Sequence, residues 1–333
     1  MRESMVDRNT ETIDVVIPVY NGEKYIIQAI TSVERQTYLP KKIIVVDDGS
    51  TDKTNHFIHH FHGKIPLEYI QKKNEGPNSA RNAGIQKCTS QFIAFLDADD
   101  EWYADKLERQ VKIFQISRFK NLGVVYCAYS IIDEKGDLIN DQFIIHNPSA
   151  RGHVFKQILP LNTITGSASG VLIKNECFER VGMFDETLRI GEDWDMWLRI
   201  AKEYEFDYVN KALVKIRRHD RNAQNNESFV FRNKLMFYNK WATSLPDDID
   251  VPPYWIKSLI NLIFNRLPKT DFIKLFRSSI SSEVKKKFLH TISHELKWYI
   301  CVKIAILPFI LISKIIYFPF KKTCQKNKIS AKR

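Results

Sequence analysis

Features typical of several protein classes are absent from this sequence of 333 residues. Its five cysteines are scattered, without the paired spacing of a zinc site or a disulfide framework, which favours a reducing compartment. The polar segment Met1–Thr12 has no apolar core and predicts no secretory signal peptide. With 44% hydrophobic and 27% charged residues, the composition excludes wholesale disorder, a collagen-like repeat and a polytopic membrane protein.

Positive charge is concentrated at one end of the chain. The net charge is +11, but residues 251–333 hold 17 Lys and Arg against 3 Asp and Glu, whereas the remainder holds 33 against 36. A charge confined to one end indicates an acidic partner for that end, either anionic lipid or nucleic acid. Pro246, Pro252 and Pro253 indicate a boundary near residue 250. At about 150 residues per domain, the length allows two domains or one with a long extension.

Short β-branched runs alternate with helical stretches from residue 12 onward. The first four runs predict strands at Asp14–Val19, Ile43–Val46, Leu67–Ile70 and Gln91–Leu96. Because these runs are almost continuously apolar, they are typical of parallel strands buried on both faces. The later pattern predicts helices and strands at Tyr103–Ser117, Gly123–Ser130, Ala168–Ile173, Asn175–Val181, Asp193–Tyr204 and Tyr208–Ile216.

Polar clusters follow three of the predicted strands. They are Tyr20–Gly22, Asp47–Asp52 and Asp97–Asp100. Ligands of open parallel α/β sheets bind at the carboxyl ends of the strands, so these clusters are the first candidates for a site. Taken singly, each is explained equally well by helix caps and turns, as for Ser50 and Thr51.

Asp97 and Asp99 are separated by one residue directly after an apolar strand. Two carboxylates so close together repel each other unless a cation lies between them. A divalent ion with oxygen ligands, Mn²⁺ or Mg²⁺, bridging to substrate phosphates satisfies this arrangement. A lone Asp-x-Asp is a weak signal, but it becomes strong beside two further clusters at matching strand ends.

Five motifs together resemble the family 2 glycosyltransferases, whose nucleotide-diphosphosugar-binding fold is called GT-A. In order, the motifs are Val16–Asn21, Val46–Asp52, Ala80–Gly84, Asp97–Asp100 and Gly191–Asp195. The resemblance implies an α/β GT-A domain over residues 13–222, with a Rossmann-like, mostly parallel sheet flanked by helices. A tail of residues 1–12 would precede it, and a basic helical extension, residues 223–333, would follow.

The resemblance also implies roles for individual residues of the donor site. The residues that would frame or contact the donor nucleotide are Pro18, Tyr20, Glu23, Asp48 (at the base), Arg81 (near the base or ribose) and Asp97 (at the ribose). Asp99 would ligate the metal, which neutralises charge developing on the departing diphosphate. His219 would be a second metal ligand and Arg217 would bind the diphosphate, as an Arg-x-His pair at the end of a strand.

The motif Gly191–Asp195 begins a predicted helix and carries three acids. In the resembling family the Asp of the Glu-Asp pair is the general base, which here is Asp193. It would take the proton of an acceptor hydroxyl during a single in-line displacement that inverts the anomeric centre. Glu192 and Asp195 would make acceptor or structural contacts. The alternative is that these acids only complement the positive end of the helix.

The segment 298–320 is mostly apolar but is interrupted by Lys303, Lys314 and two prolines. Three interpretations remain open: a helix lying in a membrane interface, a helix packed on the domain, and, least favoured, a transmembrane span. Four closely spaced histidines, His56, His59, His60 and His62, are interpreted as a solvated helix surface and not as a metal site.

The sequence thus predicts a metal-dependent inverting glycosyltransferase that uses a nucleotide-diphosphosugar, expected to be a UDP-sugar. The expected acceptor is a glycan or a lipid-linked glycan, at the cytoplasmic face of the cell membrane, where the basic tail would bind anionic lipid. No nucleic-acid partner is expected. The alternatives are a nucleotidyltransferase on a related fold and a non-enzymatic nucleic-acid- or membrane-binding protein that uses the tail.

Overall fold

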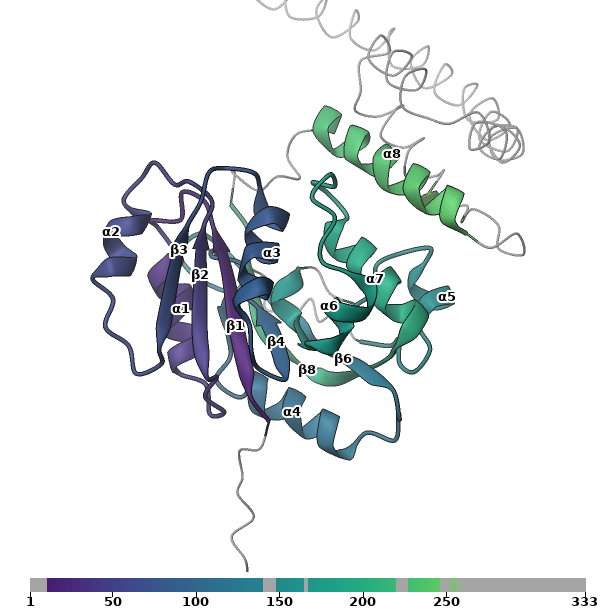
Figure 1. The fold of residues 1–333 in the computed structure, drawn as a ribbon, viewed down its shortest axis with the longest axis horizontal. Helices are drawn as coiled ribbons and strands as arrows, with labels where there is room; N and C mark the ends of the chain where they lie inside the picture. Colours follow the sequence, from purple (N-terminus) through teal and green to yellow (C-terminus); the bar gives the residue numbers. More distant parts are fainter. Residues whose placement is uncertain are drawn as a thin grey trace, which may run out of the picture.

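Eight strands form one mixed sheet with helices on both faces (Figure 1). The computed structural model describes residues 11–139, 148–164, 167–219 and 227–245, together with Pro252, Tyr254, Trp255 and Ser258. Across the sheet the strand order is β3-β2-β1-β4-β7-β6-β8-β5. All of these strands except β7 and β5 run in one direction. The predicted α/β class with a mostly parallel sheet is confirmed.

The boundaries of the elements follow the sequence pattern closely. The strands are β1 (Ile13–Val19), β2 (Lys42–Asp47), β3 (Leu67–Gln71), β4 (Phe92–Phe95), β5 (Glu101–Trp102), β6 (Leu122–Ile132), β7 (Val171–Lys174) and β8 (Glu205–Arg217). The helices are α1 (Ile26–Glu34), α2 (Thr54–His59), α3 (Pro77–Lys87), α4 (Lys106–Ile116), α5 (Phe155–Ile158), α6 (Glu176–Val181), α7 (Glu192–Glu203) and α8 (Glu227–Ser244). A short 3₁₀ helix, η1 (Ala168–Gly170), precedes β7, where the sequence predicted regular structure from residue 168.

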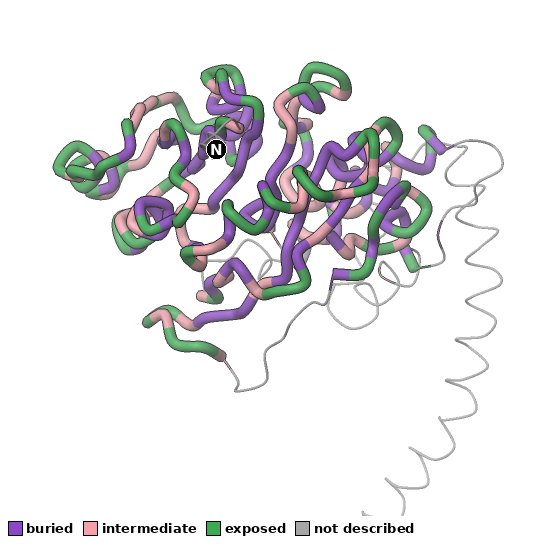
Figure 2. Tube along the Cα trace, turned by 90° about the horizontal axis from the view of Figure 1, so that it is seen from below, coloured by how far each residue is buried: buried purple, intermediate pink, exposed green. Residues whose placement is uncertain are grey.

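The strands β3, β2, β1 and β4 form a parallel unit at one side of the sheet. Every residue of β1 is buried. Val16 packs in the core that includes α3, whereas Val15 and Ile17 pack in the core that includes α1. This burial on both faces explains why the strand sequences are continuously apolar. Figure 2 shows the buried stretches running through the middle of the molecule and the exposed ones at its loops.

The other side of the sheet departs from the parallel pattern. β7 runs antiparallel between β4 and β6, and β6 pairs in parallel with β8 through register shifts between Cys127 and Tyr129. The short β5 closes this edge by pairing antiparallel with β8. Because β1, β2 and β4 are parallel neighbours, the loops that follow them meet at one edge of the sheet.

Helix α8 belongs to the same core as the sheet. Phe231, Leu235, Phe237 and Trp241 are buried in the cluster that also holds residues of α3 and α7. Trp255 is buried there as well, and its indole N–H donates to the carbonyl oxygen of Leu159 at 3.0 Å. The domain boundary at residue 222 stays a prediction, and the structure shows that hydrophobic packing continues beyond it.

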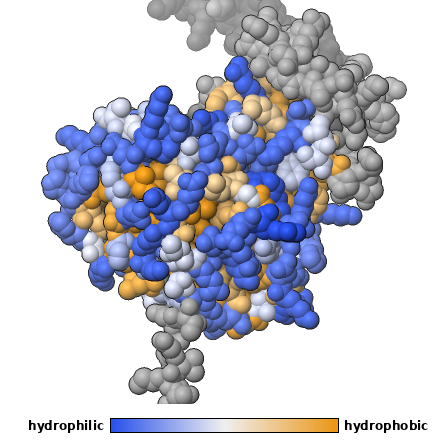
Figure 3. Space-filling view, viewed as in Figure 1, coloured by the Kyte–Doolittle hydropathy of each residue, from blue (hydrophilic) through white to orange (hydrophobic). Residues whose placement is uncertain are grey.

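Among the described residues, no helix is both long enough and apolar enough to cross a bilayer. On the face seen in Figure 3, hydrophilic side chains predominate and apolar areas lie between them. The segment 298–320 and most of the basic extension lie outside the described residues.

Candidate active site

The loops after β1 and β2 are joined by hydrogen bonds at the carboxyl edge of the sheet. The backbone N–H of Asn21 donates to Ser50 Oγ at 2.9 Å, and the N–H of Thr51 donates back to Asn21 Oδ1 at 2.8 Å. The N–H of Glu23 donates to Asp52 Oδ2 at 3.1 Å. Ser50, Thr51 and Asp52 thus act as turn and linking residues, as the simpler interpretation of their motif held.

Three of the predicted donor residues lie on the loop between β1 and α1 or immediately before it. Pro18 is buried within β1, and Tyr20 directly after the strand is 52% exposed. Glu23 accepts a hydrogen bond from the N–H of Lys53 at 3.0 Å. The exposed ring of Tyr20 is therefore available at this edge for a planar group to stack on, while Glu23 holds the second loop.

Asp48 holds the loop between β3 and α3. Its side chain is buried, and it accepts hydrogen bonds from Lys72 Nζ at 3.1 Å, the N–H of Glu75 at 3.0 Å and the N–H of Gly76 at 2.6 Å. Gly76 has a φ of 99°, and a Cβ there would meet the guanidinium of Arg189. A glycine is therefore required at this position both by its backbone conformation and by the space that Arg189 fills.

The acidic loop after β4 is supported by two serines of a distant segment. Ser167 Oγ donates to Asp97 Oδ2 at 3.2 Å, and Ser169 Oγ donates to Asp100 Oδ2 at 2.7 Å. The N–H of Asp97 donates to Ser169 Oγ at 3.0 Å. Burial, with Asp99 and Asp97 close by, raises the pKa of the Asp100 carboxyl well above its usual range. These serines position the acids from the start of η1.

Asp99 and His219, the two predicted metal ligands, are in contact. Asp99 Oδ2 is 2.9 Å from His219 Nε2. This is a hydrogen-bond distance, and the roles of both residues as metal ligands stay predictions. Burial raises the pKa of Asp99, the charge of Asp97 adds to this, and the hydrogen bond from His219 opposes it. Among the described residues, no group of three or more His, Cys, Asp or Glu is arranged to hold a metal.

Arg217 is buried beside this pair, with only 1% of its surface exposed. Its Nε donates to the carbonyl oxygen of Asp99 at 2.9 Å, and its Nη2 donates to Gln28 Oε1 at 3.0 Å and Glu101 Oε1 at 2.6 Å. The guanidinium lies 4.5 Å from the ring centre of Tyr25. The diphosphate contact of Arg217 stays a prediction; the contacts observed fix the loop that carries Asp99.

Asp193 lies in the first turn of α7, after Gly191 in a left-handed conformation with a φ of 79°. Its Oδ1 accepts the N–H of Trp194 at 2.7 Å, and Asn162 Nδ2 approaches its Oδ2 to 3.5 Å. Burial and the neighbouring Glu192 carboxylate raise the pKa of Asp193 to about 7. A carboxylate with this pKa accepts protons effectively near neutral pH, which is what a general base requires.

Arg81, on α3, connects the acidic loop with the start of α7. Its Nη2 donates to Asp97 Oδ1 at 2.8 Å, and its Nη1 lies 3.6 Å from Glu192 Oε1. The structure thus brings Arg81, Asp97 and Glu192 together, and the charge of Asp97 also acts on Asp193.

Asp195 is wholly buried and faces α8. It accepts hydrogen bonds from Arg199 Nε and Trp241 Nε1, both at 2.9 Å, and lies 2.8 Å from Lys240 Nζ. Of the two roles predicted for Asp195, these contacts agree with the structural one.

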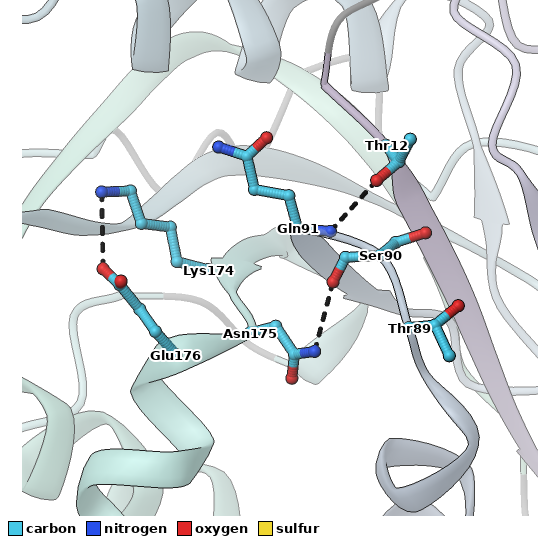
Figure 4. A pocket seen from close by; sticks show the side chains of 7 residues that line it. All are labelled: Thr12, Thr89, Ser90, Gln91, Lys174, Asn175 and Glu176. Carbon is cyan, nitrogen blue, oxygen red and sulfur yellow. Dashed lines mark hydrogen bonds and ion pairs between the residues drawn. The ribbon is translucent and has the colours of Figure 1, made fainter.

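A separate pocket lies at the opposite edge of the sheet (Figure 4). It is lined by Thr12, which precedes β1, by residues 89–91, which precede β4, and by Lys174, Asn175 and Glu176. Asn175 donates to the carbonyl oxygen of Ser90 at 3.2 Å. This pocket therefore lies at the amino ends of the strands, away from the motif residues.

Sequence reasoning did not identify Ser167, Ser169, Asn162 or Arg189. Ser167 accepts the N–H of Ser169 at 3.0 Å as the N-cap of η1, so a Ser-x-Ser capping pattern was the available signal. Asn162 and Arg189 lie in irregular segments, where periodicity gives no indication of direction.

Comparison with known proteins identifies the family of this chain. Residues 14–182 match the family described as Glycosyl transferase family 2. An uncharacterized glycosyltransferase of Rickettsia conorii is 35% identical over 209 residues, which are 63% of this chain and 33% of that protein. The chain thus spans about a third of the length of that relative.

Two further proteins extend the comparison. The UDP-Glc:alpha-D-GlcNAc-diphosphoundecaprenol beta-1,3-glucosyltransferase WfgD of Escherichia coli is 26% identical over 263 residues, 78% of this chain and 95% of that protein. The mannosyltransferase PcManGT of Pyrobaculum calidifontis, solved with GDP-Man and Mn²⁺, superposes with a TM-score of 0.54 at 17% identity, covering 87% of this chain and 76% of that one. The match over half of the sequence, with a GT-A-like fold, shows that this chain belongs to glycosyl transferase family 2.

Proposed function

We propose that this glycosyltransferase is a metal-dependent, inverting enzyme that moves a sugar from a UDP-sugar to a hydroxyl of a glycan or lipid-linked glycan. The observation that carries the proposal is the placement of Asp193. Its carboxylate, with a pKa of about 7, lies at the start of α7 beside a loop that carries Asp97 and Asp99. The residue proposed as general base thus lies near the residues proposed to hold the donor.

The donor would lie along the carboxyl edge of the sheet. Tyr20, with its exposed ring, Pro18 and Glu23 would frame the nucleotide, and Asp48 with the loop at Gly76 would meet the base. Arg81 and Asp97 would lie near the ribose. The names of the E. coli glucosyltransferase and of the PcManGT complex support a nucleotide-diphosphosugar, and the former supports UDP.

Asp99 and His219 would hold Mn²⁺ or Mg²⁺, and Arg217 would keep their loop in place while facing the diphosphate. When bound, the ion would neutralise the negative charge that develops on the departing diphosphate. The Mn²⁺ in the PcManGT complex supports this assignment.

Asp193 would remove the proton from the acceptor hydroxyl as its oxygen attacks the anomeric carbon on the face opposite the diphosphate. One displacement of this kind inverts the anomeric centre. Glu192 would help to orient the acceptor. Because the base must be ionised, transfer should rise with pH through about 7 in the wild-type protein.

Membership of the family removes the support for the nucleotidyltransferase and the non-enzymatic alternatives. The acceptor named for the E. coli relative is attached to a diphosphoundecaprenol lipid, which supports a lipid-linked acceptor. We also propose that the basic segment 251–333 binds the anionic inner face of the cell membrane. Sedimentation with phosphatidylglycerol vesicles but not with phosphatidylcholine vesicles is expected, and equal sedimentation with both would contradict it.

The proposed donor site is tested by calorimetric titration of the full chain with UDP, GDP, CDP and ADP, with and without Mn²⁺. UDP binding that depends on Mn²⁺ and is lost in Asp99→Asn is expected. The matched control is Asp105→Asn, which removes a carboxylate that pairs with Lys211 away from the site and should bind as the wild type does. Metal-independent binding, or unchanged binding in Asp99→Asn, would contradict the metal assignment.

A further inference from the structure

Arg81 is a buried cation between two parts of the site. The proposed donor side is formed by the loops after β1, β2 and β4, and the proposed acceptor side is the start of α7, with Glu192 and Asp193. It comes from α3, and only 5% of its surface is exposed. Toward the donor side its Nη2 donates to Asp97 Oδ1 at 2.8 Å, and toward the acceptor side its Nη1 lies 3.6 Å from Glu192 Oε1. Its guanidinium also lies 5.5 Å from the ring centre of Phe184, which limits its movement.

A hydrogen-bonded asparagine fixes this guanidinium relative to the segment before α7. Asn78 Oδ1 accepts from Arg81 Nη1 at 3.1 Å, and Asn78 Nδ2 donates to the carbonyl oxygens of Asp185 at 2.9 Å and Leu188 at 2.7 Å. The position of Arg81 is thus set by the same segment that leads into the helix of Glu192 and Asp193.

Two negative charges and one positive charge act on the Asp193 carboxyl group. Glu192 on its own helix and Asp97 from the loop after β4 both raise the pKa of Asp193, whereas Arg81 from α3 lowers it. Asn162 and the N–H of Trp194 are its neutral partners. Among the groups that act on Asp193, Arg81 is the cation, and a guanidinium remains charged at every accessible pH.

We propose that Arg81 is a positioning residue for the start of α7: by pairing with Glu192, it places a positive charge beside the adjacent carboxylates of Glu192 and Asp193 and offsets their repulsion. Asp193 can then ionise near neutral pH. This rests on the proposed role of Asp193 as the base. Arg81 thereby also makes base ionisation depend on Asp97, because one guanidinium serves both carboxylates. The Nε–H of Arg81 is buried and has no hydrogen-bond partner among the described residues.

The proposal is tested by the pH dependence of kcat/KM for the acceptor, which reports the ionisation of the base in the free enzyme. In Arg81→Met the rising part of the pH profile (the rising limb) should move up from about pH 7, by roughly one unit, because the loss of a nearby opposite charge raises the pKa of a carboxyl group. In Glu192→Gln the limb should move down. In the double variant it should return toward the wild-type position, since both charges are gone.

Arg81→Lys serves as the charge-conserving control and should keep its limb closer to the wild type than Arg81→Met does. If Arg81 had only a structural role, its loss would lower kcat/KM at every pH without moving the rising part of the pH profile. That result would overturn the proposal. If Arg81→Met fails to fold, the double variant, which leaves no unpaired Glu192, is compared with Glu192→Gln. Equal limbs in those two would also overturn it. Full activity in Asp193→Asn would instead refute the base itself, which separates the two failures.

Discussion

The proposed donor side and the proposed acceptor side of the site are held together by different kinds of interaction. On the donor side, turn residues such as Asn21, Ser50 and Asp52 link two loops through hydrogen bonds to backbone N–H groups. On the acceptor side, a buried carboxylate, Asp195, joins α7 to α8. The two loops of the proposed donor side are thus joined by several hydrogen bonds to backbone N–H groups, whereas the two helices at the proposed acceptor side are joined by one buried carboxylate.

The largest effect should come from removing the base without disturbing this framework. In Asp193→Asn, kcat should fall by about 10²–10⁴-fold, the usual contribution of a general base, while nucleotide binding is kept. Thermal unfolding should occur at an unchanged or higher temperature, because the substitution removes the repulsion from Glu192. Steady-state kinetics with Glu179→Gln, an exposed acid on α6, provide the control. Equal rates in the two variants would contradict the assignment.

The next effect should be on stability and not on chemistry. Asp195→Asn removes the buried charge that Arg199 and Lys240 share, while Lys240 keeps its pair with Asp185, so the free energy of unfolding should fall by about 2 kcal/mol. Urea denaturation measures it. Glu203→Gln, on the same helix, breaks only an exposed pair with Arg180 and should change it by less than about 1 kcal/mol. Equal losses in the two variants would show that Asp195 does not anchor α8.

The smallest effect should come from a single donor-side link. Asn21 has a φ of 51°, so Asn21→Ala loses its hydrogen bonds to Thr51 and strains the backbone by about 1–2 kcal/mol. Asn21→Gly loses the same bonds without the strain. The KM for the nucleotide-sugar should rise several-fold in Asn21→Ala and less in Asn21→Gly, with kcat nearly unchanged. A loss confined to kcat would contradict the donor-side assignment of this loop.

The loops of the proposed donor side could be predicted from the sequence because each polar cluster directly follows a recognisable strand. Parallel strands buried on both faces produce continuous apolar runs, and the polar clusters follow them directly, as at Asp97 and Asp99. The buried side of α8 could not be predicted, because the indole of Trp241 is paired with Asp195, which lies 46 positions earlier in the sequence. The contacts of Arg217 with Gln28 and Glu101 are likewise invisible in a linear pattern.

The contact between Arg81 and Glu192 crosses the end of the family match at residue 182. A chimaera that exchanges residues 14–182 between two relatives would carry the loops after β1, β2 and β4, with Arg81, into a host that keeps its own α7, α8, Arg217 and His219. The nucleotide-sugar preference should then travel with the exchanged piece and the acceptor preference should stay with the host. The chimaera would need an incoming piece that presents a cation to Glu192, so this ion pair is one of the contacts that two relatives must share for such an exchange to work.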